Sequence, residues 1–214
     1  MMATQSNYII PTKRLVLSLP EEKDIDRLVT LAGDARISAT TATMPYPYEQ
    51  KNAEDWIAMA SKGVETGDRY IFALRLKESL DLIGGIGLHL NILHNRAEMG
   101  YWVGHPYWNQ GYMSEAASAM IDFGFRQLEL HRIYAHHITT NIASGKVMIH
   151  NGMQQEGLLR GHLYKEGTYH DLALYGLMRE DYLTRNHTPH KVIRRSNQYA
   201  SALSLKLSPP KITS

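Results

Sequence analysis

The residues best suited to chemistry in this 214-residue chain gather in one junction, residues 105–116 (His-Pro-Tyr-Trp-Asn-Gln-Gly-Tyr-Met-Ser-Glu-Ala). A strand pattern over residues 97–104 precedes the junction, and a helical pattern over residues 114–128 follows it. A turn at the start of a helix presents unpaired N–H groups and the positive end of the helix dipole, so it can bind an anion. Gly111 would let the main chain approach a phosphate, and Ser114 could cap the helix or donate its hydroxyl. An ordinary capped helix fits the same pattern.

Several other kinds of site are excluded or disfavoured. The junction has neither the Gly-Lys-Ser/Thr of a Walker loop nor a Gly-x-Gly-x-x-Gly fingerprint. The chain contains no cysteine, which excludes a thiol nucleophile, a disulfide framework and a cysteine zinc site. Among its eleven histidines, His136 and His137 are adjacent on a predicted strand and would point to opposite faces. No His-Glu-x-x-His spacing occurs, so we expect no metal site.

A family resemblance gives the junction its context. Residues 98–103 (Glu-Met-Gly-Tyr-Trp-Val) and 108–116 resemble the Glu-x-Gly-Tyr-Trp … Trp-Gly-Lys-Gly-x-Ala-Thr-Glu-Ala block of the RimJ/RimL-type GNAT acetyltransferases. The resemblance continues, in the family's order, at residues 12–17 (Thr-Lys-Arg-Leu-Val-Leu), 82–88 (Leu-Ile-Gly-Gly-Ile-Gly-Leu), 141–144 (Asn-Ile-Ala-Ser), 151–153 (Asn-Gly-Met), 155–157 and 169–171. These blocks extend over about residues 12–182.

The resemblance implies the GNAT fold, which is mixed α/β with a mostly antiparallel, partly splayed seven-stranded sheet flanked by about four helices. The residue patterns agree: an antiparallel meander comes first, then a strand–helix–strand crossover over 97–139, and a closing hairpin over 154–178. We expect residues 1–185 to form this domain and residues 186–214 to form a flexible, basic C-terminal tail. Five basic and no acidic residues follow residue 185, so the remainder of a chain with net charge +2 carries −3.

The resemblance also implies acetyl-CoA as co-substrate. The loop amides would hold its pyrophosphate, at Gln110, Gly111, Met113 and Ser114. The strand edge at Trp102 and Val103 would pair with the amides of its pantetheine arm, and Asn141 would bind further along that arm. The chain departs from the family at Met113, where Gly or Ala is usual, and at Met148, where many GNAT enzymes have a tyrosine acid. RimJ/RimL-type members more often present a serine at the position of Ser144.

The implied reaction is attack of a free amine on a thioester, and it needs proton transfers. We expect Glu98 to be the general base, although a strand-end carboxylate could equally form an ion pair. The resemblance implies that Ser144 would donate a proton or a hydrogen bond to the leaving thiolate, and the Val103 N–H could stabilise the oxyanion. Asn141 and Ser144 would also suit a helix N-cap.

The acceptor site is the least defined part of the prediction. Prolines exclude a regular helix over residues 44–48, and Tyr46, Tyr48 and Trp56 could wall a bound amine or could simply pack. The acceptor would be a primary amine, either a protein N-terminal α-amine or a small-molecule amine.

Two rival functions remain open: a catalytically weak acyl-CoA-binding sensor, and a ribosome- or RNA-associated protein that uses the basic tail. We expect no nucleic-acid partner, because the domain itself is mildly acidic. The chain shows no signal peptide and no membrane-length apolar run, which predicts a cytoplasmic protein without a membrane partner. Exposed tyrosines would suit a homodimer.

Overall fold

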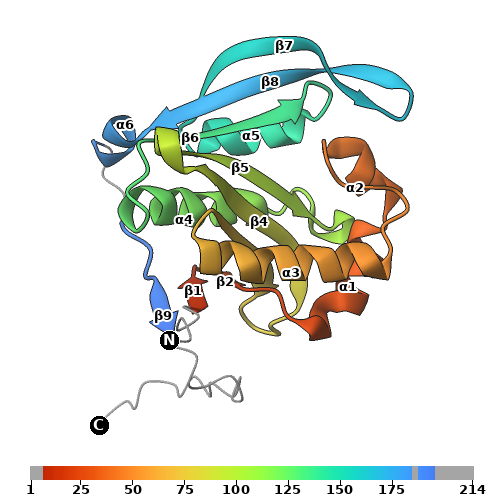
Figure 1. Ribbon diagram of the computed structural model, residues 1–214, viewed down its shortest axis with the longest axis horizontal. Coiled ribbons are helices and arrows are strands. Elements are labelled where there is room, and N and C mark those ends of the chain that lie inside the picture. Colours follow the sequence, from red (N-terminus) through yellow and green to blue (C-terminus); the bar gives the residue numbers. More distant parts are fainter. Residues whose placement is uncertain (1–6, 185–187, 196–214) are drawn as a thin grey trace.

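A nine-stranded open sheet forms the centre of the computed structural model, which describes residues 7–184 and 188–195 (Figure 1). The strand order is β7-β8-β6-β5-β4-β3-β2-β1-β9. The strands are β1 (Asn7–Pro11), β2 (Leu15–Ser18), β3 (Arg69–Leu76), β4 (Leu82–Asn91), β5 (Arg96–Val103), β6 (Arg132–Ile138), β7 (Gln154–Lys165), β8 (Thr168–Met178) and β9 (Ile193–Arg195). All neighbours pair antiparallel except β5 and β6, which are parallel.

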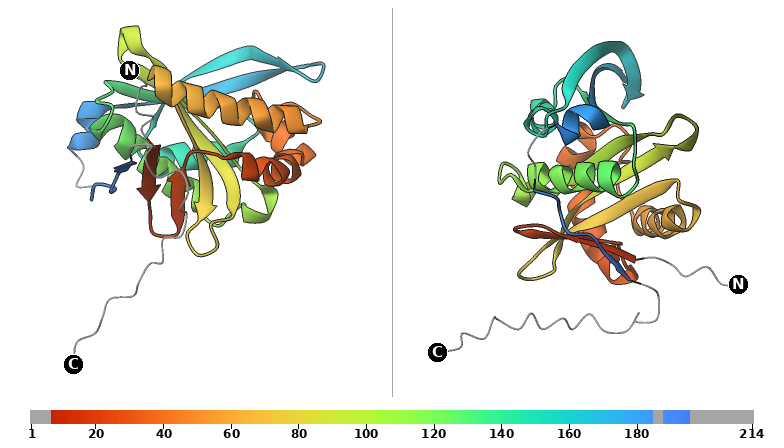
Figure 2. Two further views of the ribbon diagram at one scale, coloured as in Figure 1. Left: turned by 60° about the horizontal axis from the view of Figure 1, so that its bottom comes forward. Right: turned by 90° about the vertical axis from the view of Figure 1, so that its left-hand side faces the viewer.

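Helices cover both faces of the sheet (Figures 1 and 2). The α-helices are α1 (Ile25–Ala32), α2 (Ala35–Thr40), α3 (Gln50–Thr66), α4 (Tyr112–Arg126), α5 (Ile142–His150) and α6 (Arg179–Leu183), and short 3₁₀ turns occupy Glu22–Asp24, Ile92–His94 and His105–Tyr107. Helices α1 and α3 pack on one face, whereas α4 packs on the other beside α5. None of the helices in the described ranges is long and apolar enough to cross a membrane.

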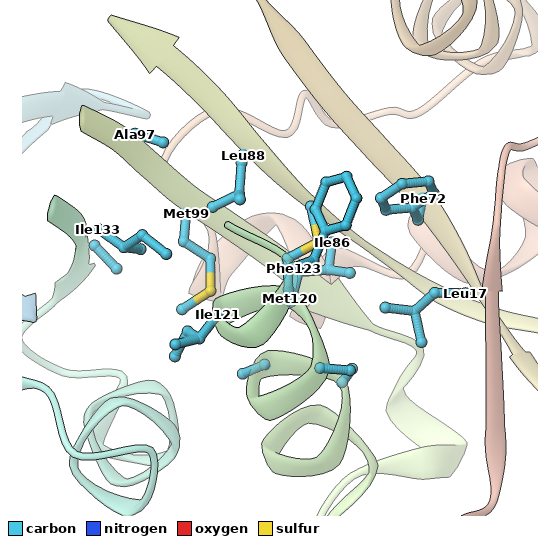
Figure 3. Packing of buried hydrophobic residues seen from close by; sticks show 14 of the residues in the cluster. Leu17, Phe72, Ile86, Leu88, Ala97, Met99, Met120, Ile121, Phe123 and Ile133 are labelled. Atoms are coloured by element: carbon cyan, nitrogen blue, oxygen red, sulfur yellow. The ribbon is translucent and has the colours of Figure 1, made fainter. Parts of the chain in front are cut away.

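Helix α4 is the centre of the larger core. Met120, Ile121 and Phe123 project from α4 toward Leu88 and Met99 of the sheet, and all five side chains are almost fully buried (Figure 3). Burying side chains of this size stabilises the fold by about 1.5–3 kcal/mol each. This packing fixes the second half of α4 against β4 and β5.

The mixed α/β GNAT-like architecture, the crossover and the closing hairpin are confirmed, whereas the element counts need correction. The described residues contain nine strands and six α-helices, where seven strands and about four helices were expected. The additional elements include β9, α2 and α6, of three, six and five residues. Segments this short do not display a full hydrophobic period, so the sequence pattern cannot reveal them.

The start of the expected C-terminal tail is part of the sheet. Strand β9 pairs antiparallel with β1, and the backbone N–H of His190 donates a 2.8 Å hydrogen bond to the buried carboxylate of Asp122 in α4. This corrects the prediction of a flexible tail for residues 188–195. The rest of that prediction, for residues 186–187 and 196–214, lies outside the described residues.

Candidate functional site

The central strands part beside a large cavity. Strands β5 and β6 pair only over Arg96–Glu98 and Arg132–Tyr134, although each continues for several residues beyond that point. Past Glu98, the edge of β5 that faces β6 has no ladder partner, which leaves backbone groups that an extended ligand could pair with. A cavity of about 770 Å³ lies at this separation and is lined from β5, β6, α5, the start of α4 and the segment between α2 and α3.

The turn at the start of α4 has the geometry expected of an anion site. Asn109 and Gly111 both adopt left-handed conformations, with φ of 59° and 75°. Gly111 occupies the N-cap and makes no side-chain cap, and the first backbone bond back to it comes from the N–H of Glu115. The amides of residues 112–114 therefore precede the helical ladder, at the positive end of its dipole.

The predicted loop residues divide into two groups. Gly111, Met113 and Ser114 line the cavity, but Gln110 does not: its side chain donates to the Pro106 carbonyl at 2.9 Å. Ser114 lies within the first turn of α4 and is not its N-cap, because the helix begins two residues earlier than expected. Met113 is 7 % exposed and joins the core. Its backbone remains at the loop while its side chain packs inward.

Arg14, which the sequence pattern did not single out as a site residue, holds the loop from the turn between β1 and β2. Its guanidinium donates to the Gln110 carbonyl at 2.8 Å and to the Glu115 carboxylate at 2.7 Å, and lies over the Tyr112 ring. Burial alone would raise the pKa of Glu115, but hydrogen bonds from Thr12 and Arg14 outweigh it and lower that pKa. The carboxylate is thus kept ionised, and these contacts hold the loop in shape.

Ser144 meets a tyrosine at the other side of the cavity. Its Oγ lies 2.9 Å from the Tyr101 hydroxyl, which also lies 3.1 Å from the Ser144 carbonyl oxygen. Burial raises the pKa of Tyr101 well above its ordinary value, and the Ser144 contact opposes this only in part. Tyr101 is therefore a neutral hydrogen-bond donor that can orient the serine. Its place in the Gly-Tyr-Trp block was the available signal for it.

Asn141 has structural roles within the described residues. Its side-chain oxygen accepts from the Ser144 N–H at 3.2 Å, which is the N-cap arrangement expected as an alternative, and its amide donates to the Thr40 carbonyl at 2.9 Å. Asn141 also lines the cavity, together with Trp102 and Val103 of β5. The Val103 carbonyl accepts from the Trp108 indole at 2.7 Å. Met148 is 1 % exposed and belongs to the core, so it does not line the cavity.

Glu98 stands where β5 and β6 separate. Its carboxylate lies 3.4 Å from the His136 Nδ1 and 3.4 Å from the Tyr134 hydroxyl, and its side chain is 38 % exposed. His89 is its cross-strand neighbour on β4. Burial lowers the pKa of His89, an effect that the nearby Arg69 reinforces and Glu98 opposes. Glu98, His89 and His136 all line the cavity.

Two of the three predicted acceptor residues reach the cavity. Tyr48 is 8 % exposed and Trp56 packs over Gly85, where an added Cβ would lie 2.6 Å from the indole ring. Tyr46 is 59 % exposed and lies outside the lining, so the structure does not bring it to the others. Within the described ranges, no group of three or more histidine or acidic side chains is placed to hold a metal ion.

Comparison with known proteins identifies the family. The acetyltransferase (GNAT) domain profile matches residues 14–154, so the chain belongs to the GNAT acetyltransferases, and it is an N-acetyltransferase. Solved structures that are similar to it include RimL and RimJ. It is 32 % identical over 172 residues to the uncharacterized N-acetyltransferase p20 of Bacillus licheniformis, covering 80 % of this chain and 96 % of that protein.

Two further comparisons extend the likeness. The [ribosomal protein uS5]-alanine N-acetyltransferase of Escherichia coli is 25 % identical over 185 residues, which cover 81 % of this chain and 92 % of that protein. The solved structure of the ribosomal alpha-N-protein acetyltransferase RimL in complex with coenzyme A superposes with a TM-score of 0.73 at 21 % identity. The superposition covers 79 % of this chain and 97 % of that one. At that identity, the RimL structure supports the fold alone.

Proposed function

We propose that the chain transfers an acetyl group from acetyl-CoA to a primary amine by direct attack within a ternary complex. The observation that carries this proposal is that one cavity is continuous. It joins the start of α4, where the amides of residues 112–114 precede the helical ladder, to Glu98 and to the aromatic side chain of Trp56. A thioester and an amine bound at the two ends of one cavity would meet beside the separation of β5 and β6.

The cofactor end fits an anionic, amide-bearing ligand. The amides of residues 112–114 would hold the pyrophosphate, with Arg14 supporting the loop through Gln110 and Glu115. The unpaired edge of β5 toward Val103 would pair with the amides of the pantetheine arm. RimL, which shares the fold and was solved in complex with coenzyme A, supports this choice of co-substrate.

The reaction would use groups already in the cavity. Glu98 accepts a proton from the attacking amine, directly or through water, while the nitrogen forms a bond to the thioester carbonyl carbon. The carbon–sulfur bond then breaks, and the leaving thiolate accepts a hydrogen bond from Ser144, whose hydroxyl Tyr101 orients. The proton that Glu98 took from the amine then passes through water to the thiolate or to the solvent. An α-amine with a pKa of about 8 needs less help from the base than a lysine amine with a pKa of about 10.4.

The acceptor class is a primary amine, and a protein N-terminus or a small-molecule amine would each fit. The uS5-alanine acetyltransferase relative supports the first. The test is release of the coenzyme A thiol from acetyl-CoA in the presence of N-terminal peptides, lysine side-chain amines and small amines. Binding of acetyl-CoA without thiol release for any amine would overturn the proposal in favour of a sensor.

A variant that fills part of the cavity tests whether acetyl-CoA binds there. An added Cβ at Gly100 of β5 would meet no heavy atom within 4 Å, and Gly100 lines the cavity. Gly100→Leu should therefore project into the cavity and lower acetyl-CoA affinity at least about tenfold, while the protein stays folded. Gly157→Leu is the matched control, because a Cβ there also meets open space but the residue lies on β7, outside the lining. Equal affinities for acetyl-CoA in the two variants would place the ligand elsewhere.

A further inference from the structure

The tip of the β7–β8 hairpin holds the end of α2, more than a hundred residues earlier in the chain. Figure 1 shows the hairpin arching over the sheet until its tip stands above α2. From this tip the Lys165 ammonium donates to three backbone carbonyls, those of Ser38 at 2.6 Å, Thr41 at 2.8 Å and Met44 at 3.2 Å. An ammonium has three N–H donors, so this single side chain can engage all three carbonyls at once.

The three carbonyls share a reason for needing a donor. They belong to the last turn of α2 and to the irregular segment after it, where backbone oxygens have no continuing helical ladder. A cation at a helix C-terminus satisfies such oxygens and interacts favourably with the dipole. Partial burial lowers the pKa of the Lys165 ammonium, and the neighbouring Glu166 opposes that effect. Neutral carbonyl oxygens thus replace part of the water that this charge has lost.

The clamped segment forms a wall of the cavity. Residues 40–45 all line it, and Tyr48 follows a few residues later. A second tie reaches the same segment from the start of α5, since the Asn141 amide donates to the Thr40 carbonyl at 2.9 Å. Within the segment, the Thr41 N–H donates to the Ser38 carbonyl and the Ser38 hydroxyl donates to the Met44 carbonyl, both at 3.1 Å. Lys165 and Asn141 add the ties that join the segment to the rest of the fold.

We propose that Lys165 is a positioning residue that fixes the 38–45 segment as the wall of the amine-acceptor subsite. This inference rests on the proposed acetyl transfer and adds to it the residue that shapes the acceptor end. Lys165 does not line the cavity itself, so it acts on the acceptor only through the backbone it holds. Its loss should therefore change amine recognition and leave the cofactor loop as it was.

The test compares Lys165→Met with Lys77→Met. Methionine keeps much of the aliphatic stem and removes the donors. Lys77 also donates to a backbone carbonyl, that of Thr12 at 3.2 Å, but lies outside the cavity lining. We expect Lys165→Met to raise the KM for the amine about tenfold, in keeping with the loss of charge-assisted hydrogen bonds, with the KM for acetyl-CoA unchanged. Lys77→Met should leave both constants unchanged, and Lys165→Arg should restore part of the loss.

Amide hydrogen exchange separates this inference from the proposed function. Exchange over residues 38–45 should accelerate in Lys165→Met and not in Lys77→Met. Unchanged exchange in Lys165→Met, or faster exchange with an unchanged KM for the amine, would overturn the positioning role while leaving acetyl transfer intact. A wild-type protein that acetylates no amine would instead overturn the proposed function.

Discussion

The two ends of the cavity are built in different ways. The end proposed for the cofactor is a local structure: the turn at residues 109–111 gets its shape from two left-handed residues and leads directly into α4. The acceptor end depends on distant contacts, because Lys165 and Asn141 hold the segment after α2 from 121 to 127 and from 101 residues away. The backbone turn of the first end is set by a short stretch of sequence and is then braced by one distant residue, Arg14, whereas the second end takes its shape from contacts across the completed fold.

Under the proposed function, this difference separates the binding of acetyl-CoA from the recognition of the amine acceptor. A backbone turn that precedes a long, well-packed helix keeps its geometry whatever happens at the hairpin. The acceptor wall can change with a single substitution at the hairpin tip, without disturbing the helix that anchors the cofactor loop. Mutations should therefore separate the two affinities, and the following predictions test that separation from the largest expected effect to the smallest.

The largest effect is expected at the junction between the two ends. Glu98→Gln keeps the shape of the side chain and removes its ability to accept a proton, so kcat should fall by about 10²–10⁴. The KM for acetyl-CoA should not change, and the loss should be greater for a lysine amine than for an α-amine at neutral pH. Steady-state kinetics with both amines measures this. An unchanged kcat would remove Glu98 from the mechanism and leave the histidines of the cavity lining, among them His89 and His136, as candidate bases.

The affinity for acetyl-CoA should fall when the backbone of the loop before α4 is strained. Gly111 has a φ of 75°, so Gly111→Val introduces strain of about 1–3 kcal/mol and should weaken acetyl-CoA binding about ten- to hundredfold. Gly67 has a φ of 74° at the end of α3, away from the cavity lining, so Gly67→Val imposes the same strain elsewhere. Calorimetric titration should show lost affinity only in the first variant. Similar affinities in both would show that the loop amides do not hold the ligand.

A smaller effect is expected for Ser144, the proposed hydrogen-bond donor to the leaving thiolate. Ser144→Ala should lower kcat about tenfold, because it removes one hydrogen bond to a developing charge. Tyr101→Phe should have a similar effect, since the Tyr101 hydroxyl lies 2.9 Å from the Ser144 Oγ. If the two hydroxyls act as a unit, the double variant should lose little more than either single one. Fully additive losses in kcat would argue for two independent roles.

The smallest effect concerns stability at high pH on the acceptor side. Burial raises the pKa of Tyr48 from 10.0 to about 12, so between these values the unfolded chain releases a proton that the folded chain keeps. The free energy of unfolding should therefore fall as the pH rises through this window, and Tyr48→Phe should make that fall shallower by at most one proton. Urea unfolding at several pH values measures the slope. Parallel profiles for the two proteins would contradict the buried state of Tyr48.

What could be foreseen from the sequence follows the same division. The turn near Gly111 and the crossover were predictable, because their residues are adjacent in the chain and their φ and helix preferences are local. Arg14 and Lys165 could not be placed in the same way: their partners lie about a hundred residues or more away, and no periodic pattern marks a side chain that bonds to a carbonyl. Gln110 was assigned through the family resemblance and Tyr46 as a possible wall of the acceptor site; neither lines the cavity, and Tyr46 is 59 % exposed.

Strand β9 bears on how the protein is made. Residues 193–195 pair with residues 7–9, so β1 acquires this outer neighbour only after the more than 180 residues between the two strands have been synthesised. Until then β1 has β2 on one side and an open edge on the other, the kind of exposed edge that invites pairing with a second chain. Truncation before residue 193 would make that temporary exposure permanent. A shortened chain should therefore aggregate more readily, although it still contains every residue that lines the cavity.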